Sequence, residues 1–246
     1  MCRHLAYLGS PLALDALLLQ PEHSLLHQSY EPHHQVSGVV NADGFGAGWY
    51  DHAIRPEPAR YRSDRPIWTD RSFASLAGLV RSGAVLAAVR SATPGFPVEE
   101  SGAAPFTAGP WLFSHNGIVE GFAAGIGVEL RASVSDARAA AIEGHTDSEV
   151  LFALTLDQLD GGATPGAALA AVVKAVDAHT NGRINLLLTD GNRVAATAWG
   201  DSLFVRHSSA GTIIASEPID ATPEWQRVPD RSLVESDATD VLVTAL

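Results

Sequence analysis

The sequence predicts an α+β fold in which mainly antiparallel sheets are covered by helices. Short apolar runs with strand character occur in the first half of the chain, and two long helical segments follow them. From Arg183 onward the pattern changes to consecutive short β runs, with Asp190-Gly191 and Gly200-Asp201 as hairpin turns. Strands, then a block of helices, then hairpins are typical of α+β proteins.

Strands and two short helical segments are expected in the first half. Arg3–Gly9 is an apolar run that a Gly-Ser-Pro turn ends, which indicates a strand. Leu12–Gln20 carries its leucines on one broad face, as a helix does. Asp70–Arg81 also has helical character, with Asp70 or Ser72 placed to cap it. The other strands expected here are Gly44–Tyr50, Ala84–Ser91 and Trp111–His115, the last two separated by a proline- and glycine-rich loop through Pro110.

Two longer helices are expected next. Thr146-Asp147-Ser148-Glu149 has the spacing of a capping box, which predicts a helix from there to about Leu159. A glycine-rich break then precedes a second helix over Pro165–His179. The strands expected after these helices are Ile184–Thr189, Val194–Trp199, Leu203–His207 and Thr212–Ala215.

Composition and charge exclude several classes of function. The 246 residues have a formal net charge of −12 and no cluster of Lys and Arg, so we expect no nucleic-acid partner. No apolar run is long enough to span a membrane, so we expect no membrane partner. A single cysteine forbids an internal disulfide, which is consistent with a reducing cytoplasm. No linker divides the chain, so residues 1–246 are expected to form one domain.

The ten histidines do not predict a metal site. His33 and His34 are adjacent and face different ways, and no helical pair of histidines encloses a Glu. Cys2 and His4 lack the further ligands of a tetrahedral site. No phosphate-binding loop occurs either, so we expect neither a metal nor an organic cofactor; the oligomeric state stays open.

Cys2 is the only cysteine, and it follows the initiator Met. Because its side chain is small, Met1 is expected to be removed, which leaves Cys2 with a free α-amine beside its own thiol. An α-amine has an ordinary pKa of about 7.7–8.0 and can take the thiol proton near neutrality. That pairing is the N-terminal-nucleophile way of activating a side chain. The alternative is that Cys2 is a small apolar residue entering a strand.

Three further motifs each have a structural and a functional interpretation. Asn116-Gly117 is a common hairpin turn, but its amide and backbone N–H groups can also converge as an oxyanion hole. Arg90 ends an apolar strand, where it can form a surface ion pair or bind a carboxylate through two parallel hydrogen bonds. Taken alone, both motifs favour the structural interpretation. Asp147 fits a helix start and an ammonium-binding site equally well.

Five fragments stand in a definite order along the chain: MCRHLAYLG, NADGFGAGWY, VRSATPG, FSHNGIV and HTDSEVLF. Together they resemble the glutaminase domain of class II glutamine amidotransferases, members of the N-terminal-nucleophile hydrolase superfamily. The resemblance covers the first two-thirds of the chain and reverses the structural interpretations above. It implies a four-layer αββα sandwich of two antiparallel sheets flanked by helices.

The resemblance also implies a role for each motif residue. Cys2 would be the nucleophile, and Asn116 with Gly117 would form the oxyanion hole. Arg90 would bind the α-carboxylate of the substrate and Asp147 its α-ammonium group. Thr93 would line the same pocket.

The last third of the chain bears on the substrate. ASEPIDATPEWQRVPD, together with MCRH and GAAPF, resembles a stand-alone branch of the family that hydrolyses γ-glutamyl-hercynylcysteine sulfoxide in ergothioneine biosynthesis. Ala103-Ala104 stand where many ammonia-transferring relatives have His or Asn, a departure that fits a bulkier leaving group. Two alternatives are a glutaminase subunit that delivers ammonia to a separate synthetase and a non-catalytic γ-glutamyl-binding module.

The leaving group of that branch ends in a trimethylammonium group, which aromatic rings accommodate through cation–π contacts. Some of four aromatic residues, together with an acid, are therefore expected to border it. These residues are Trp49, Tyr50, Trp111 and Trp225.

Overall fold

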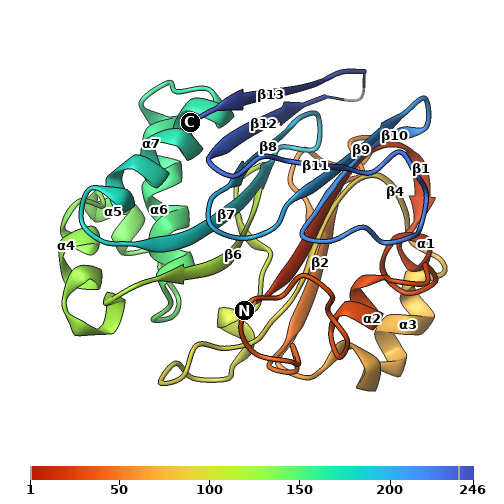
Figure 1. The fold of residues 1–246 in the computed structure, drawn as a ribbon, viewed down its shortest axis with the longest axis horizontal. Coiled ribbons are helices and arrows are strands. Elements are labelled where there is room, and N and C mark those ends of the chain that lie inside the picture. Colours follow the sequence, from red (N-terminus) through yellow and green to blue (C-terminus); the bar gives the residue numbers. More distant parts are fainter. Residues whose placement is uncertain (1, 238) are drawn as a thin grey trace.

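The computed structural model describes residues 2–237 and 239–246, and it places two antiparallel sheets between two groups of helices (Figure 1). In spatial order, the first sheet contains β11 (Gln226–Arg227), β9 (Phe204–Ser208), β10 (Gly211–Ala215), β1 (Arg3–Ala13), β4 (Arg81–Val89), β2 (Phe45–Trp49) and β3 (Ala59–Ser63). The second contains β13 (Val241–Ala245), β12 (Ser232–Ser236), β8 (Val194–Ala198), β7 (Gly182–Thr189), β6 (Trp111–Val119) and β5 (Phe106–Ala108). This confirms the predicted α+β class.

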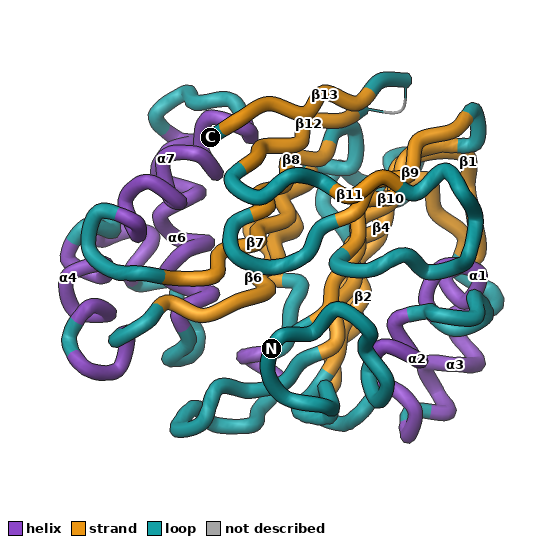
Figure 2. The backbone as a smooth tube through the Cα atoms, in the orientation of Figure 1, coloured by secondary structure: helices purple, strands orange, loops and turns teal. Residues whose placement is uncertain are grey.

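The helices form two outer layers, one on each sheet (Figure 2). The first sheet is covered by α1 (Leu14–Leu18), α2 (Leu25–Gln28) and α3 (Arg71–Ala77). On the side of the second sheet lie α4 (Ile126–Ala132), α5 (Asp136–Ala139), α6 (Asp147–Asp160) and α7 (Pro165–Asp177). Short 3₁₀ turns occur at Ile67–Thr69, Glu100–Gly102 and Phe122–Ala124. No helix in the described part of the chain is long and apolar enough to cross a membrane.

Alternation along β1 explains why four layers form. Leu5 and Tyr7 pack into the apolar cluster beneath α1–α3, whereas Ala6 and Leu8 pack into the cluster between the two sheets. Successive side chains of a strand point to opposite faces, so a strand that is apolar throughout must be covered on both sides. A third cluster, between the second sheet and α6–α7, completes the sandwich. The αββα arrangement implied by the resemblance is therefore confirmed.

Several elements begin or end at other residues than the sequence predicts. Asn116-Gly117 is not a turn, because β6 continues through both residues to Val119. The predicted helix over Leu12–Gln20 begins only at Leu14, since β1 extends to Ala13 across an irregularity in its pairing with β4. Asp70, not Ser72, caps α3, and its carboxylate accepts the N–H of Phe73 at 2.8 Å.

One predicted hairpin is wrong. Asp190-Gly191 does join the paired strands β7 and β8, with Gly191 at a φ of +85°. Gly200-Asp201, however, connects β8 of the second sheet to β9 of the first. The short strands β3 and β5 and the C-terminal hairpin of β12 and β13 had no counterpart in the sequence prediction, and the same holds for α4 and α5.

Candidate active site

Cys2 lies immediately before β1, the central strand of the first sheet. Arg3 is opposite Val89 of β4, so the cysteine lies beside the point where β4 ends. Its thiol is half-buried, with Sγ 3.9 Å from the carbonyl oxygen of Ser91. Met1 and its predicted removal lie outside the described residues.

A cavity opens at Cys2, with about 490 Å³ of space between protein atoms, part of it open to solvent. Five of the six predicted site residues line it: Cys2, Arg90, Thr93, Gly117 and Asp147. They come from the start of β1, the end of β4 and the loop after it, β6, and the start of α6. Residues distant in sequence thus meet at one end of the sandwich. This cavity is therefore the candidate site for a substrate.

Arg90 is a buried cation at the cavity wall. Its guanidinium donates to three backbone carbonyls, the shortest contact being 3.1 Å to Pro97. Among the described residues, no carboxylate lies within ion-pair distance of it. Gly102 leaves room for it, because a Cβ at that position would be 2.6 Å from Nη2. A buried positive charge at the cavity wall is suited to bind a carboxylate.

Asp147 is held at the first turn of α6. Thr146 and Glu149 form the predicted capping box, with the Thr146 side chain accepting the N–H of Glu149. The Asp147 carboxylate accepts the N–H of Val119 at 3.0 Å and that of Ser148 at 2.8 Å. The buried acid is therefore fixed in orientation and carries negative charge to the cavity wall.

The backbone N–H of Gly117 points away from β7. Gly117 is opposite Ile184, whose N–H is donated to Trp199 of β8 at 2.7 Å. Because the N–H of Ile184 faces β8, Ile184 and Gly117 form a non-hydrogen-bonded pair between β7 and β6. The N–H of Gly117 therefore points away from β7. The N–H of Val119, two residues on, faces that same edge and meets Asp147. Among the described residues the N–H of Gly117 has no partner, and it points toward the edge where the cavity lies.

Glycine is required at position 117 for packing as well. A Cβ there would lie 1.7 Å from the carbonyl oxygen of Arg183 and 2.8 Å from Nε2 of His115. The φ of +155° is also unfavourable for other residues. β5 pairs only with residues 111–113 of β6, which leaves the edge at Gly117 without a neighbouring strand.

Asn116 is the predicted site residue that does not line the cavity. It is completely buried, and its Nδ2 lies 3.4 Å from Oγ of Ser216, in the layer between the two sheets. Its Oδ1 has no hydrogen-bond partner among the described residues. The structure therefore places Asn116 next to Gly117 but directs its amide toward Ser216.

The comparison with known families decides the assignment. The profile of the glutamine amidotransferases class-II family matches residues 22–209, well over half of the chain. The chain belongs to the class-II glutamine amidotransferase family.

Several relatives within this family are similar over their full length. The γ-glutamyl-hercynylcysteine sulfoxide hydrolase of Mycolicibacterium smegmatis is 44% identical over 246 residues, which is 100% of both chains. The protein of the same name from Mycobacterium tuberculosis strain H37Rv is 43% identical over 250 residues, covering 100% of this chain and 97% of that one.

Solved structures agree on the fold of a class-II glutamine amidotransferase. A glutamine aminotransferase class-II domain protein from Silicibacter pomeroyi superimposes with a TM-score of 0.71 and 28% identity, covering 99% of each chain. The glutamine phosphoribosylpyrophosphate amidotransferase of B. subtilis gives a TM-score of 0.68 at 15% identity, over 99% of this chain and 49% of that one. At such low identity the second match supports the fold alone.

Glu217 is a buried residue that contacts Arg3, next to Cys2, and the sequence analysis assigned it no role. Its carboxylate forms an ion pair with Arg3 at 3.1 Å and accepts a hydrogen bond from His23 at 2.7 Å. It also accepts the backbone N–H groups of His33 and His34. Burial alone would raise the pKa of Glu217, but these hydrogen bonds outweigh it and hold the pKa at about 2. Glu217 thus links Arg3, the residue after Cys2, to the loop at residues 33–34.

His23, His33 and Glu217 are the one group among the described residues whose atoms could hold a metal ion, with one ligand atom each within 4.8 Å. Both oxygens of Glu217 already accept hydrogen bonds, however. We therefore interpret the cluster as a structural hydrogen-bond network around Glu217.

The four aromatic residues expected near the leaving group do not line the Cys2 cavity. The hydroxyl of Tyr50 donates to the carbonyls of Pro110 and Thr189. Trp225 packs against Arg206, with the guanidinium 5.0 Å from its ring centre. Trp49 and Trp111 pack against two of the apolar clusters.

Proposed function

We propose that this class-II glutamine amidotransferase hydrolyses the γ-glutamyl amide bond of γ-glutamyl-hercynylcysteine sulfoxide, releasing glutamate and hercynylcysteine sulfoxide, a step of ergothioneine biosynthesis. The observation that carries the proposal is the 44% identity, without terminal gaps, to a relative of that name. The cavity that joins Cys2, Arg90 and Asp147 supports it, because a γ-glutamyl group carries one carboxylate and one ammonium group.

Cys2 is the proposed nucleophile. Removal of Met1 gives it a free α-amine, which takes the thiol proton directly or through a water molecule. The thiolate attacks the γ-carbonyl carbon, the C–N bond breaks, and the protonated amine donates its proton to the departing nitrogen. Water then hydrolyses the thioester, which releases glutamate and restores the thiol.

Gly117 and Asn116 are the proposed oxyanion hole. The outward-facing N–H of Gly117 supports the role of that residue. For Asn116 to take part, its side chain must rotate from Ser216 toward the reacting carbonyl. Its Oδ1 has no hydrogen-bond partner among the described residues, so only the contact with Ser216 is lost on rotation. Losing one such donor typically costs about 3–4 kcal/mol of transition-state stabilisation.

Arg90 and Asp147 are proposed to bind the two charged groups of the glutamyl end, with Thr93 beside them. Both residues line the cavity; the Arg90 guanidinium has no acidic partner among the described residues, and the Asp147 carboxylate is fixed by hydrogen bonds, which supports this assignment. Binding both groups fixes the γ-carbonyl relative to the sulfur, and orientation of this kind can contribute several kcal/mol.

We further propose a cytoplasmic location and a single domain whose partner is this small-molecule substrate. The catalytic role requires that the single cysteine stays a thiol, which a reducing compartment ensures.

The substrate and the nucleophile can be tested together. Purified protein is given the sulfoxide conjugate or glutamine, and glutamate release is followed for the wild type and for Cys2→Ala. The proposal predicts rapid hydrolysis of the conjugate, slow hydrolysis of glutamine and no turnover by the variant. Rapid turnover of glutamine alone would favour a glutaminase that supplies ammonia to a synthetase. Full hydrolysis by Cys2→Ala would exclude the catalytic role.

A further inference from the structure

His115 is a buried histidine of β6 that lines the Cys2 cavity and takes no part in the mechanism proposed above. Only 1% of its side chain is exposed. Successive side chains of a strand face opposite sides, so His115 lies on the face of β6 toward α6, whereas Asn116 lies on the face toward Ser216. The imidazole therefore lies between β7 and the first turn of α6, and its two ring nitrogens reach both.

One ring nitrogen contacts the backbone that packs against Gly117. Nε2 of His115 lies 3.1 Å from the carbonyl oxygen of Arg183 in β7. A carbonyl oxygen only accepts hydrogen bonds, so Nε2 carries a hydrogen. The same oxygen lies against Gly117, because a Cβ on that glycine would be 1.7 Å from it. This hydrogen bond therefore holds the backbone group next to the residue whose N–H is proposed to stabilise the oxyanion.

The other ring nitrogen contacts the start of α6. Nδ1 of His115 lies 3.0 Å from Oγ of Ser148, and in a neutral imidazole with its hydrogen on Nε2 it can only accept. The Ser148 hydroxyl therefore donates to His115. The backbone N–H of Ser148 is donated to the Asp147 carboxylate at 2.8 Å. The bond between His115 and Ser148 thus fixes the residue that orients Asp147.

The proposed substrate requires His115 to be neutral. Its Nδ1 lies 3.9 Å from Oδ1 of Asp147. A protonated imidazole would place a positive charge beside the acid that is proposed to bind the ammonium group of the substrate, and the two cations would repel each other. With a neutral ring, the negative charge of Asp147 stays available to the substrate.

We infer that His115 is a positioning residue whose two ring nitrogens serve different parts of the site. Nε2 positions Gly117 through the Arg183 carbonyl, and Nδ1 positions Asp147 through Ser148. The inference rests on the proposed function, because Gly117 acts there on the transition state and Asp147 acts on binding of the γ-glutamyl group. Loss of the first bond should therefore lower kcat, and loss of the second should raise KM.

Two conservative variants separate the two nitrogens. The amide of Gln can take the place of Nε2, so His115→Gln keeps a donor for Arg183 and loses the acceptor for Ser148. The shorter Asn reaches only as far as Nδ1, so His115→Asn keeps that acceptor and loses the donor. Steady-state kinetics of both variants are measured on the sulfoxide conjugate and on glutamine, which share the glutamyl end.

The expected result is opposite in the two variants. For His115→Gln, KM should rise about three- to tenfold with little change in kcat, the size that the loss of one hydrogen bond typically gives. For His115→Asn, kcat should fall by a similar factor with little change in KM. Ser148→Ala removes the hydroxyl alone and should reproduce the higher KM of His115→Gln.

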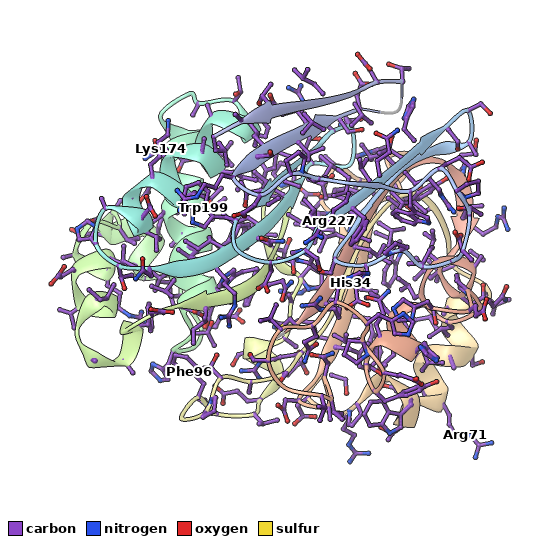
Figure 3. All side chains as sticks on the ribbon, viewed as in Figure 1. His34, Arg71, Phe96, Lys174, Trp199 and Arg227 are labelled. Atoms are coloured by element: carbon purple, nitrogen blue, oxygen red, sulfur yellow. The ribbon has the colours of Figure 1, made fainter. Side chains whose placement is uncertain are left out.

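His179→Gln is the matched control. His179 is exposed just beyond the end of α7, the helix that carries Lys174 in Figure 3, and it does not line the Cys2 cavity. This variant should keep the kcat and KM of the wild type. Thermal melts of all variants compare their folding.

The same change of kcat and KM in both His115 variants would overturn the inference, because a merely structural role does not distinguish Gln from Asn. An unchanged KM in Ser148→Ala would overturn it as well, even if a His115 variant failed to fold. Failure of the proposed function gives a different result. The wild type would then hydrolyse glutamine rather than the conjugate, and the opposite effects of the two variants would still be expected with glutamine.

Discussion

Two neighbouring residues of β6, Asn116 and Gly117, have different surroundings. Successive residues of a strand face opposite sides. Gly117 lines the cavity with Cys2, whereas the Asn116 side chain lies between the sheets against Ser216. An oxyanion hole formed by both residues therefore requires the backbone N–H of Gly117 and a reoriented side-chain amide of Asn116.

Replacing Asn116 by Ala tests its part in that hole. We expect kcat for a γ-glutamyl amide to fall about 10²–10³-fold with little change in KM, because the lost donor acts mainly on the transition state. Steady-state kinetics below the melting temperature measure this. Thr197→Val removes buried hydrogen bonds to Ile184 and Leu186 in the same sheet and is the matched control. Equal losses of kcat in both variants would mean that Asn116 acts only through stability.

Glu217 predicts a pH dependence of stability. Its pKa is about 2 in the folded protein against an ordinary value of 4.5, so the folded state favours the ionised form. The corresponding stabilisation, roughly 3 kcal/mol, is present above pH 4.5 and is lost as the pH falls toward 2. Urea unfolding of the wild type and Glu217→Gln at several pH values measures it. The difference between the two proteins should shrink over this interval; a constant difference would contradict the assignment.

At the scale of elements, the capping box of α6 links helix formation to the orientation of Asp147. Thr146 and Glu149 fix the first turn, and that turn carries Asp147. The four-residue signature is local, so it could be recognised in the sequence. The contact that orients Asp147 could not, because its partner Val119 lies 28 residues away on strand β6.

Thr146→Ala separates these two effects. The loss of the cap should lower the free energy of unfolding by about 1 kcal/mol. It should also raise KM for γ-glutamyl amides, because Asp147 loses its fixed orientation. Thr164→Ala removes the equivalent cap of α7, where Thr164 accepts the N–H of Ala167. This control should lose similar stability with an unchanged KM. Equal KM values in the two variants would show that the cap does not position Asp147.

Elements with strong local patterns were predictable from the sequence, and elements that depend on distant partners were not. The helices α6 and α7 and the strands β1, β4 and β7 follow from periodicity and caps. The edge strands β3 and β5 are short or half-exposed, and their partners define them rather than their own residues. Asn116-Gly117 was mistaken for a turn on local grounds because the approach of Arg183, which demands glycine, is a tertiary contact.

At the scale of the whole molecule, the four-layer sandwich places Cys2 beside residues that are distant in the sequence. β1 is central in the first sheet, between β4 and β10, so Cys2 lies among segments that begin at residues 89 and 146. In Figure 1 the N-terminal end lies between the two helical layers. The resemblance of five ordered fragments predicted six residues for the site, and five of them line this cavity.

In the proposed mechanism, the α-amine of Cys2 is the base for its own thiol. Intact-mass spectrometry of purified, fully active protein tests whether this amine is free. We expect a mass that lacks the initiator methionine. Full activity in protein that retains Met1 would contradict it, because the nitrogen of Cys2 would then be an amide without basicity.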